Sequence, residues 1–138
     1  METSMYFNSI CDDFAKILNG KSNIQNGSCS VSLHRTFGVR MMGKDASSIL
    51  GVGVNFQDLD NQGNALNISE TAVLQEEVPA YVYALTQQGI AVSAVHNHWL
   101  VTDPPQIMYV HAQSVEPPLQ FAQKMKYAFS QLSSLPVS

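Results

Sequence analysis

The sequence contains few charged residues, and positive charge is especially scarce. Only 13% of the 138 residues are charged and only seven are Lys or Arg, which gives a formal net charge of −4. An ordinary soluble domain carries about a quarter charged residues. No basic patch or arginine-rich run is present, and proteins that bind nucleic acid need such patches to neutralise phosphates. The composition therefore argues against a nucleic-acid partner.

Long apolar runs are also missing. A helix needs about 20 consecutive apolar residues to cross a bilayer, and no segment of the chain approaches that length. The first twenty residues, METSMYFNSICDDFAKILNG, lack the basic segment and the unbroken apolar stretch of a secretory signal. We therefore expect no membrane association and a cytoplasmic location.

Cysteine occurs only twice. Cys11 and Cys29 form no C-x-x-C pair and lie far along the chain from the histidines described below. Two reduced thiols in a cytosolic protein are the favoured interpretation, and a disulfide between them is the open alternative. Neither cysteine has basic neighbours that would activate it as a nucleophile.

The hydrophobic pattern predicts eight elements in the order αβββαββα. Helices are expected over 5–18, 76–88 and 118–132, and strands over 29–42, 49–59, 65–74, 90–99 and 107–113. Asn19-Gly20 and Gly89 are typical helix ends, and Pro79 and Pro118 are tolerated in a first helical turn. Strands joined by short turns favour an α+β fold, with a mainly antiparallel sheet and helices packed on one face. We expect a single domain over 1–138, with the helix over 5–18 as a candidate appendage.

Three of the four histidines fall within the stretch 92-VSAVHNHWLVTDPPQIMYVH-111. A hairpin centred between Asp103 and Pro104 would set His96 opposite His111 and His98 opposite Tyr109. Because side chains alternate along a strand and cross-strand partners share a face, these four side chains would lie together. They would share that face with Ile90, Val92 and Ala94, so we expect the helices to cover it. Three imidazoles so placed are close enough to reach one ion.

The helix over 76–88 runs back along the strand that follows it, which places Glu77 at the same end of the domain as the histidines. Glu77 is thus the predicted fourth ligand or general base. Imidazole and carboxylate donors suit Zn²⁺, and they also accept Mn, Fe, Ni or Co. Asn97 and Trp99 are expected to face the other way. Asn97 would position a loop or the site, while Tyr109 would donate a hydrogen bond or pack. His34 and Arg35 are expected on the surface.

The run 76-EEVPAYVYALTQQGIAVSAVHNHWLVTDPPQIMYVH-111 resembles the LppY/LpqO domain family of bacterial proteins. The matching positions are Glu77, Val78, Gly89, Ile90, Ala94, His96, Asn97, His98, Pro105 and His111. The similarity extends over roughly residues 30–132, and the HNH block is its most specific part. The resemblance implies a site at the histidines and no particular reaction, because the family has no established activity.

Three functions are compatible with this pattern. The first is a metal-dependent hydrolase in which His96, His98 and His111 hold a divalent ion, most simply Zn²⁺, and Glu77 acts as base or ligand. The second is a non-catalytic module that binds or senses a metal or a small-molecule ligand. The third is a structural domain whose histidines are merely solvated. A small-molecule partner is expected, and a homodimer is left open.

Overall fold

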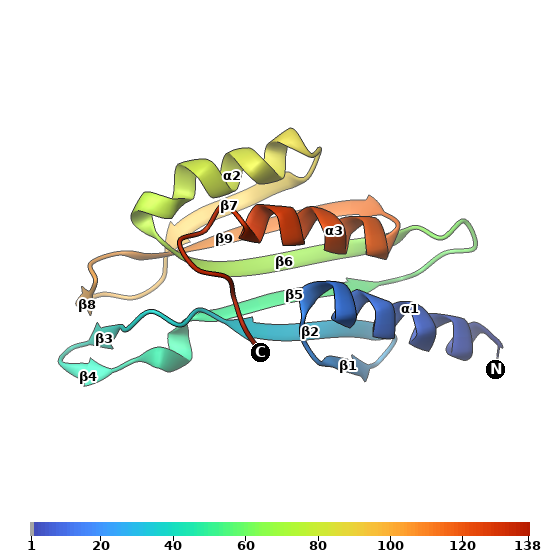
Figure 1. The fold of residues 1–138 in the computed structure, drawn as a ribbon, viewed down its shortest axis with the longest axis horizontal. Helices are drawn as coiled ribbons and strands as arrows, with labels where there is room; N and C mark the ends of the chain where they lie inside the picture. The colour runs from blue at the N-terminus through green and yellow to red at the C-terminus, as the bar shows by residue number, and fades with distance from the viewer. Residues whose placement is uncertain (1) are drawn as a thin grey trace.

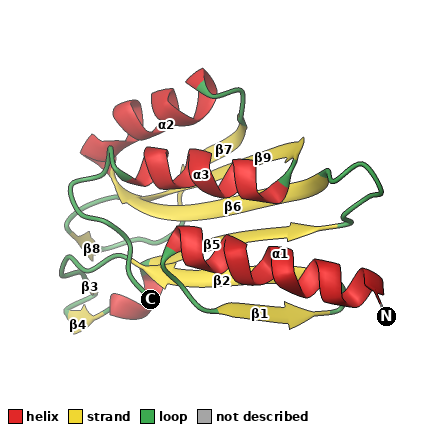
Figure 2. Cartoon of the chain, turned by 45° about the vertical axis from the view of Figure 1, so that its right-hand side comes forward, coloured by secondary structure: helices red, strands yellow, loops and turns green. Residues whose placement is uncertain are grey.

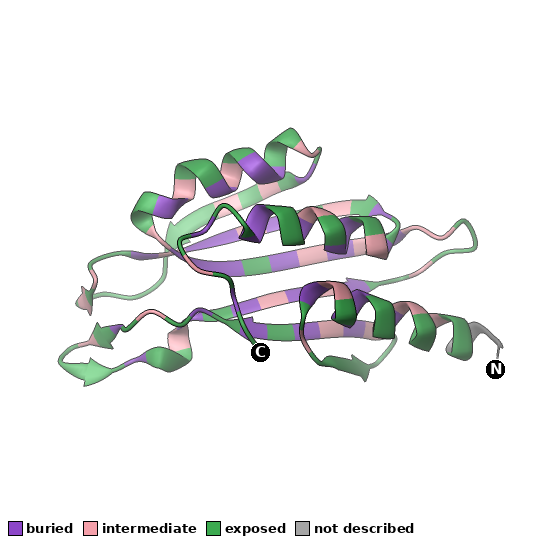
Figure 3. Cartoon of the chain, in the orientation of Figure 1, coloured by how far each residue is buried: buried purple, intermediate pink, exposed green. Residues whose placement is uncertain are grey.

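A six-stranded antiparallel sheet forms the centre of the computed structural model, which describes residues 2–138 and the side chains of residues 5–138. Its order is β1-β2-β5-β6-β9-β7 (Figure 1). These strands are β1 (Ser22–Gln25), β2 (Ser28–His34), β5 (Gly51–Gln57), β6 (Ala65–Leu74), β9 (Ile107–Glu116) and β7 (Ala91–Asn97). β6 and β9 are interior strands because each pairs with a strand on both sides, and the ladder between them is the longest in the sheet. β7 lies at an edge and is largely exposed (Figure 3).

Three helices cover one face of this sheet, as Figures 1 and 2 show. They are α1 (Glu2–Leu18), α2 (Val78–Gln87) and α3 (Pro118–Phe129), and short 3-10 turns η1 (Ser47–Ile49) and η2 (Gln75–Glu77) precede β5 and α2. Buried apolar side chains from all three helices and from the sheet form one core between the layers. The predicted α+β fold with helices on one face is confirmed. No helix in the described part of the chain has the length and apolarity needed to cross a membrane.

Local sequence explains where the helices end. Asn19 adopts a left-handed φ of 58°, and the Gly20 amide donates to the Ala15 carbonyl. A Cβ at Gly20 would lie 2.4 Å from the Val31 side chain, so a larger residue there would force β2 or its side chains to shift. Gly89 ends α2 with a φ of 81°, a conformation that glycine adopts without strain.

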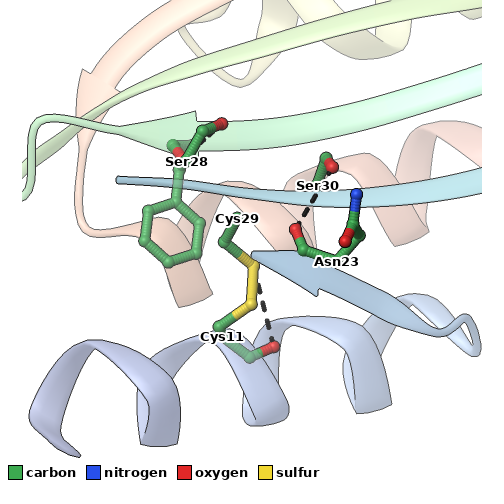
Figure 4. The surroundings of a disulfide bond; sticks show 6 residues. Cys11, Asn23, Ser28, Cys29 and Ser30 are labelled. Carbon is green, nitrogen blue, oxygen red and sulfur yellow. Dashed lines mark hydrogen bonds between the residues drawn. A yellow bond between two sulfur atoms is a disulfide. The ribbon is translucent and has the colours of Figure 1, made fainter. Parts of the chain in front are cut away.

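Cys11 of α1 and Cys29 of β2 form a disulfide (Figure 4). The expectation of two reduced thiols is therefore wrong for this structure. The sequence could not reveal that α1 lies against β2, because nothing in the periodicity reports which element a helix packs on. Cys11 is fully buried, and Phe14, Ala15 and Leu18 of the same helix also enter the main core. The helix treated as a candidate appendage is thus packed into the domain.

A second, three-stranded sheet was not predicted. It consists of β4 (Lys44–Asp45), β3 (Arg40–Met41) and β8 (Thr102–Asp103), in the order β4-β3-β8. These strands have two residues each, too short for any periodicity to appear. They lie together at one end of the molecule (Figure 1). A second apolar cluster connects this region to the main sheet through Ala72, Ile107 and Tyr109, with Val39, Ala46 and Leu50.

Candidate functional site

The face of the main sheet turned away from the helices is called the open face here. On β9, Val110 and Ala112 belong to the core beneath the helices, so the alternating Tyr109 and His111 point to the open face. Glu70 of β6 lies directly opposite His111, and His96 of β7 lies directly opposite Tyr109. Three strands that are separate in sequence therefore bring a carboxylate, two imidazoles and a phenol to one region.

The histidines lie on the open face because β7 contains a bulge. Val92 pairs with Ala112 and Ala94 pairs with His111, so the register shifts between Val92 and Ala94. Ile90 is buried in the core beneath the helices, whereas the strand beyond the bulge places His96 on the other face. The prediction that the histidines share a face with Ile90 and Val92 is wrong. A bulge changes which face the following side chains occupy, and the sequence around Ser93 gives no sign of it.

The predicted register also differs from the observed one. His96 is opposite Tyr109, rather than opposite His111. This difference of two residues keeps every side chain on the same face. The predicted gathering of histidines therefore survives, with His111 in a diagonal position relative to His96.

Two imidazoles are in direct contact. The Nε2 atoms of His96 and His111 are 3.0 Å apart, and the ring centroids are 5.0 Å apart. The Oε2 atom of Glu70 lies 3.5 Å from the same Nε2 of His111. His98 is farther away, with its ring centroid 5.7 Å from that of His96, and it forms a T-shaped contact with Trp99. All of these side chains line one pocket of about 660 Å³.

A backbone contact indicates the tautomer of His96. Its Nδ1 atom lies 3.1 Å from the carbonyl oxygen of Asn97. A carbonyl can only accept, so Nδ1 carries the proton, and in the neutral ring Nε2 then has a free lone pair. That lone pair is directed at His111. Metal-binding histidines commonly hold their other nitrogen in this way, because the carbonyl fixes both tautomer and ring orientation.

The spacing of these donors is compatible with a metal ion. Bonds of about 2.0–2.1 Å in a tetrahedral site put the donor atoms about 3.3 Å apart. The two distances measured from His111 Nε2, 3.0 Å to His96 and 3.5 Å to Glu70, lie on either side of that value. Among the side chains of residues 5–138, however, no three from His, Cys, Asp or Glu are already placed to hold one ion. The Glu70 side chain is 58% exposed, so it can rotate toward both imidazoles without disturbing the core.

Glu77 is not part of this site. It is buried on the helix side of the sheet, where it forms an ion pair of 2.7 Å with Arg35. Its carboxylate also accepts hydrogen bonds from the backbone amides of Leu74 and Ser133 and from the Ser133 hydroxyl. Burial raises the pKa of Glu77, but the bonds from Arg35, Ser133 and Leu74 outweigh it and lower the pKa to about 2. The prediction of a base or ligand at Glu77 is contradicted because the helix covers the opposite face.

The remaining candidates have structural positions. The Asn97 side-chain amide donates to the Trp99 carbonyl at 3.4 Å, so it holds the turn after β7. The Tyr109 hydroxyl donates to the Ile49 carbonyl at 2.7 Å, and burial raises the pKa of Tyr109. His34 is exposed, as expected, while its backbone pairs with Val137. Arg35, expected on the surface, is only 2% exposed.

Sequence reasoning missed Glu70 and Trp99. Glu70 is the only charged residue of β6, and only the β6–β9 register connects it to His111. A solitary carboxylate in a strand was the available signal, but it does not say which strand lies beside it. Trp99 was placed facing away from the histidines, yet it lines the same pocket because the chain leaves β7 at Asn97.

The architecture and the pocket define an α+β domain with a histidine-lined pocket on the face of its sheet opposite the helices. The chain belongs to the family described as Domain of Unknown Function (DUF1259), which matches residues 12–131. No curated protein and no solved structure matches the chain. The family match includes the whole main sheet, the bulge in β7 and all the pocket residues. Its description specifies no activity, and the resemblance to the LppY/LpqO domain stays a prediction.

Proposed function

We propose that the open face binds one divalent transition-metal ion, most simply Zn²⁺, through His96, His111 and Glu70, and that the loaded site hydrolyses a small-molecule substrate. The observation that carries this proposal is that two further donor atoms lie close to His111 Nε2. His96 Nε2 lies 3.0 Å from it and Glu70 Oε2 lies 3.5 Å from it.

The chemistry of the donor set supports this function. Two imidazoles and one carboxylate, with a further position open, are the ligands of several catalytic zinc sites. When bound, such an ion lowers the pKa of its water ligand from 15.7 to about 7. The partial exposure of His111 and Glu70 leaves the solvent side of the site open to water and substrate.

His98 replaces Glu77 as the group that would move protons. Its ring centroid lies 5.7 Å from that of His96, 4.8 Å from that of Trp99 and 5.9 Å from that of Tyr109. With an ion bound at the neighbouring donors, the His98 imidazole would be the group available to take a proton from water and to pass it to the leaving group. The metal then needs only His96, His111 and Glu70.

A non-catalytic metal or ligand module is the second candidate. Glu70 is the only carboxylate among the residues that line the pocket. Once Glu70 coordinates an ion, no second carboxylate remains nearby as a base, and a binding role needs none.

Metal titration of the stripped, untagged protein tests the metal site. We expect about one equivalent of Zn²⁺ or Co²⁺ to bind, and the double variant His96→Ala/His111→Ala to lose this binding. His34→Ala is the matched control, because it removes the one histidine outside the pocket and should bind like the wild type. Equal binding by the double variant and the wild type would refute the proposed ligands.

Activity distinguishes the two candidate functions. A hydrolase should cleave at least one member of an ester, amide and lactone panel, lose that activity on chelation, and regain it with one metal. His98→Gln should then lower kcat far more than it lowers metal affinity. Stoichiometric metal binding with no turnover across the panel would instead support the binding module.

The disulfide bears on where such a protein works. Disulfides persist in oxidising compartments and are rare in the cytosol. The Cys11–Cys29 bond thus favours an oxidising compartment over the predicted cytoplasmic location. Thiol labelling in freshly lysed cells decides between them: two labelled cysteines support the cytoplasm, and none supports the oxidising compartment.

A further inference from the structure

The pocket extends well beyond the histidines. Its volume of about 660 Å³ falls within the range of roughly 300–1,000 Å³ typical of small-molecule sites. It reaches from His96 on β7, past Glu70 on β6, to Gly53 on β5 and Ser32 on β2. Since neighbouring strands are about 4.8 Å apart, the pocket is long enough for a ligand body beside the metal donors.

The floor of the pocket beside Glu70 lacks side chains. Gly53 lies directly opposite both Glu70 and Ser32, and Gly51 is next on the same face. A Cβ at either glycine would meet no atom within 4 Å, and neither has a positive φ. Neither backbone geometry nor internal packing therefore requires glycine there, although glycine weakens a strand by roughly 0.5–1 kcal/mol. The structural consequence of these glycines is the open space above them.

The walls of the pocket are mainly apolar. Met41 and Ile49, which pack against the second core cluster, line one side, and Trp99 lines another. Trp99 remains 37% exposed, so its ring is available to a ligand. Such walls favour a compact apolar or aromatic body.

The charge of the pocket limits the charge of its ligand. Glu70 is the one acidic residue in the lining, which includes no Lys or Arg. A divalent ion coordinated by Glu70 leaves a net charge of about +1 at the site, and a bound cation is the largest local charge. One negative charge on the ligand is thus compensated, whereas a second would have no partner.

We propose that the pocket binds a small, neutral or singly anionic ligand whose polar end meets Glu70 and the His96–His111 pair while its compact apolar body lies over Gly51 and Gly53, beside Trp99. The position of the polar end rests on the proposed metal site. The position of the apolar body rests on the glycine floor and the apolar walls alone.

Trp99 is the only tryptophan of the chain, so its fluorescence reports on the pocket directly. The Zn²⁺-loaded protein would be titrated with benzohydroxamate, acetohydroxamate and phenyl phosphate. The two hydroxamates share one chelating group and differ in the ring. We expect benzohydroxamate to bind at least tenfold more tightly than acetohydroxamate, and phenyl phosphate to bind more weakly than benzohydroxamate. Equal affinity for the two hydroxamates would overturn the apolar subsite, and tighter phenyl phosphate binding would overturn the charge limit.

A substitution in the floor locates the apolar body. Gly53→Val should fold, because its side chain enters open space and a β-branched residue suits a strand. It should remove the tenfold preference for benzohydroxamate and leave Zn²⁺ stoichiometry unchanged. Asn55→Val is the matched control, since it lies on the same strand and face, outside the pocket lining. Equal loss of the preference in both variants would contradict a body seated over Gly53.

Titration of the metal-free protein tests the apolar subsite independently of the proposed metal site. Benzamide, but not acetamide, should quench Trp99 in the stripped protein at millimolar concentration, and Gly53→Val should abolish that quenching. If no metal binds but benzamide does, the metal site fails and the apolar subsite stands. If Zn²⁺ binds but benzamide has no effect on Trp99, the subsite is wrong and the metal site stands.

Discussion

Two carboxylates on opposite faces of the central sheet, Glu77 and Glu70, differ in how many partners they have. On the helix side, Glu77 is buried and its carboxylate is held by Arg35, Leu74 and Ser133. On the open face, Glu70 is 58% exposed, with a single contact at 3.5 Å to His111. The first carboxylate has no capacity left for a ligand, while the second does. The comparison teaches that a carboxylate near histidines in sequence can belong entirely to the fold.

The Arg35–Glu77 pair connects segments that are distant in the chain. Arg35 follows β2, Glu77 precedes α2, and Ser133 and Ser134 belong to the tail after α3. Arg35 also donates to the Ala72 carbonyl at 3.1 Å. This cluster fixes the tail and the start of α2 against the sheet, and it should therefore contribute to stability and not to ligand binding.

Breaking this pair should have the largest effect on folding. Glu77→Gln leaves the buried Arg35 guanidinium without its counter-charge, and loss of one member of a buried pair costs about 3–5 kcal/mol. We expect chemical denaturation to show a loss of that size. Glu70→Gln is the matched control, because the same change on the open face removes no buried charge. A loss below about 1 kcal/mol for Glu77→Gln would contradict the contrast between the faces.

Low pH should remove most of the difference in unfolding free energy between the wild type and Glu77→Gln. The folded-state pKa of Glu77 is about 2, below the ordinary 4.5. Its ionised form therefore stabilises the fold fully above pH 4.5, and this contribution is lost as the pH falls through about 2. We expect the stability gap between the two proteins to narrow by about 3 kcal/mol between pH 5 and pH 2. A gap in unfolding free energy that stays constant over that range would show that these contacts do not lower the pKa of Glu77.

The disulfide should have an effect of similar size or somewhat smaller. It closes a loop with a sequence separation of 18, for which the chain-entropy model gives about 3 kcal/mol. We expect Cys11→Ser/Cys29→Ser to lose up to that amount in denaturation while retaining wild-type metal binding, since α1 lies on the other side of the sheet. Metal affinity that falls together with stability would show that the two faces are coupled.

Much of the fold could be predicted from sequence, because the longer elements have clear periodicity. The strand predicted over 65–74 coincides with β6 (Ala65–Leu74), and the helix over 76–88 contains α2 (Val78–Gln87). The short strands β1, β4 and β8 were not predicted, since each is too short to show a repeat. The single strand predicted over 29–42 is divided into β2 (Ser28–His34) and β3 (Arg40–Met41).

The site was only partly predictable for a different reason. The spacing of His96 and His111 across one hairpin sufficed to bring them together. The bulge after Val92 was not visible, and it decides which face the histidines occupy. Assigning them to the covered face led to Glu77 in place of Glu70, since only pairing between strands distant in sequence brings Glu70 to His111.

The smallest effect on folding is expected on the open face itself. His96 and Glu70 are exposed and outside both apolar clusters, and substitutions at such positions usually change stability by about 0.5 kcal/mol or less. We expect His96→Ala and Glu70→Gln to unfold like the wild type without metal, and to lose the rise in Tm that Zn²⁺ gives the wild type, because a ligand stabilises only the state that binds it. A metal-free loss above 1 kcal/mol would mean that these side chains serve the fold after all. An unchanged rise in Tm would mean that the ion binds elsewhere. Either result would contradict the conclusion that the helix side of the sheet stabilises the fold while the open face binds the ion.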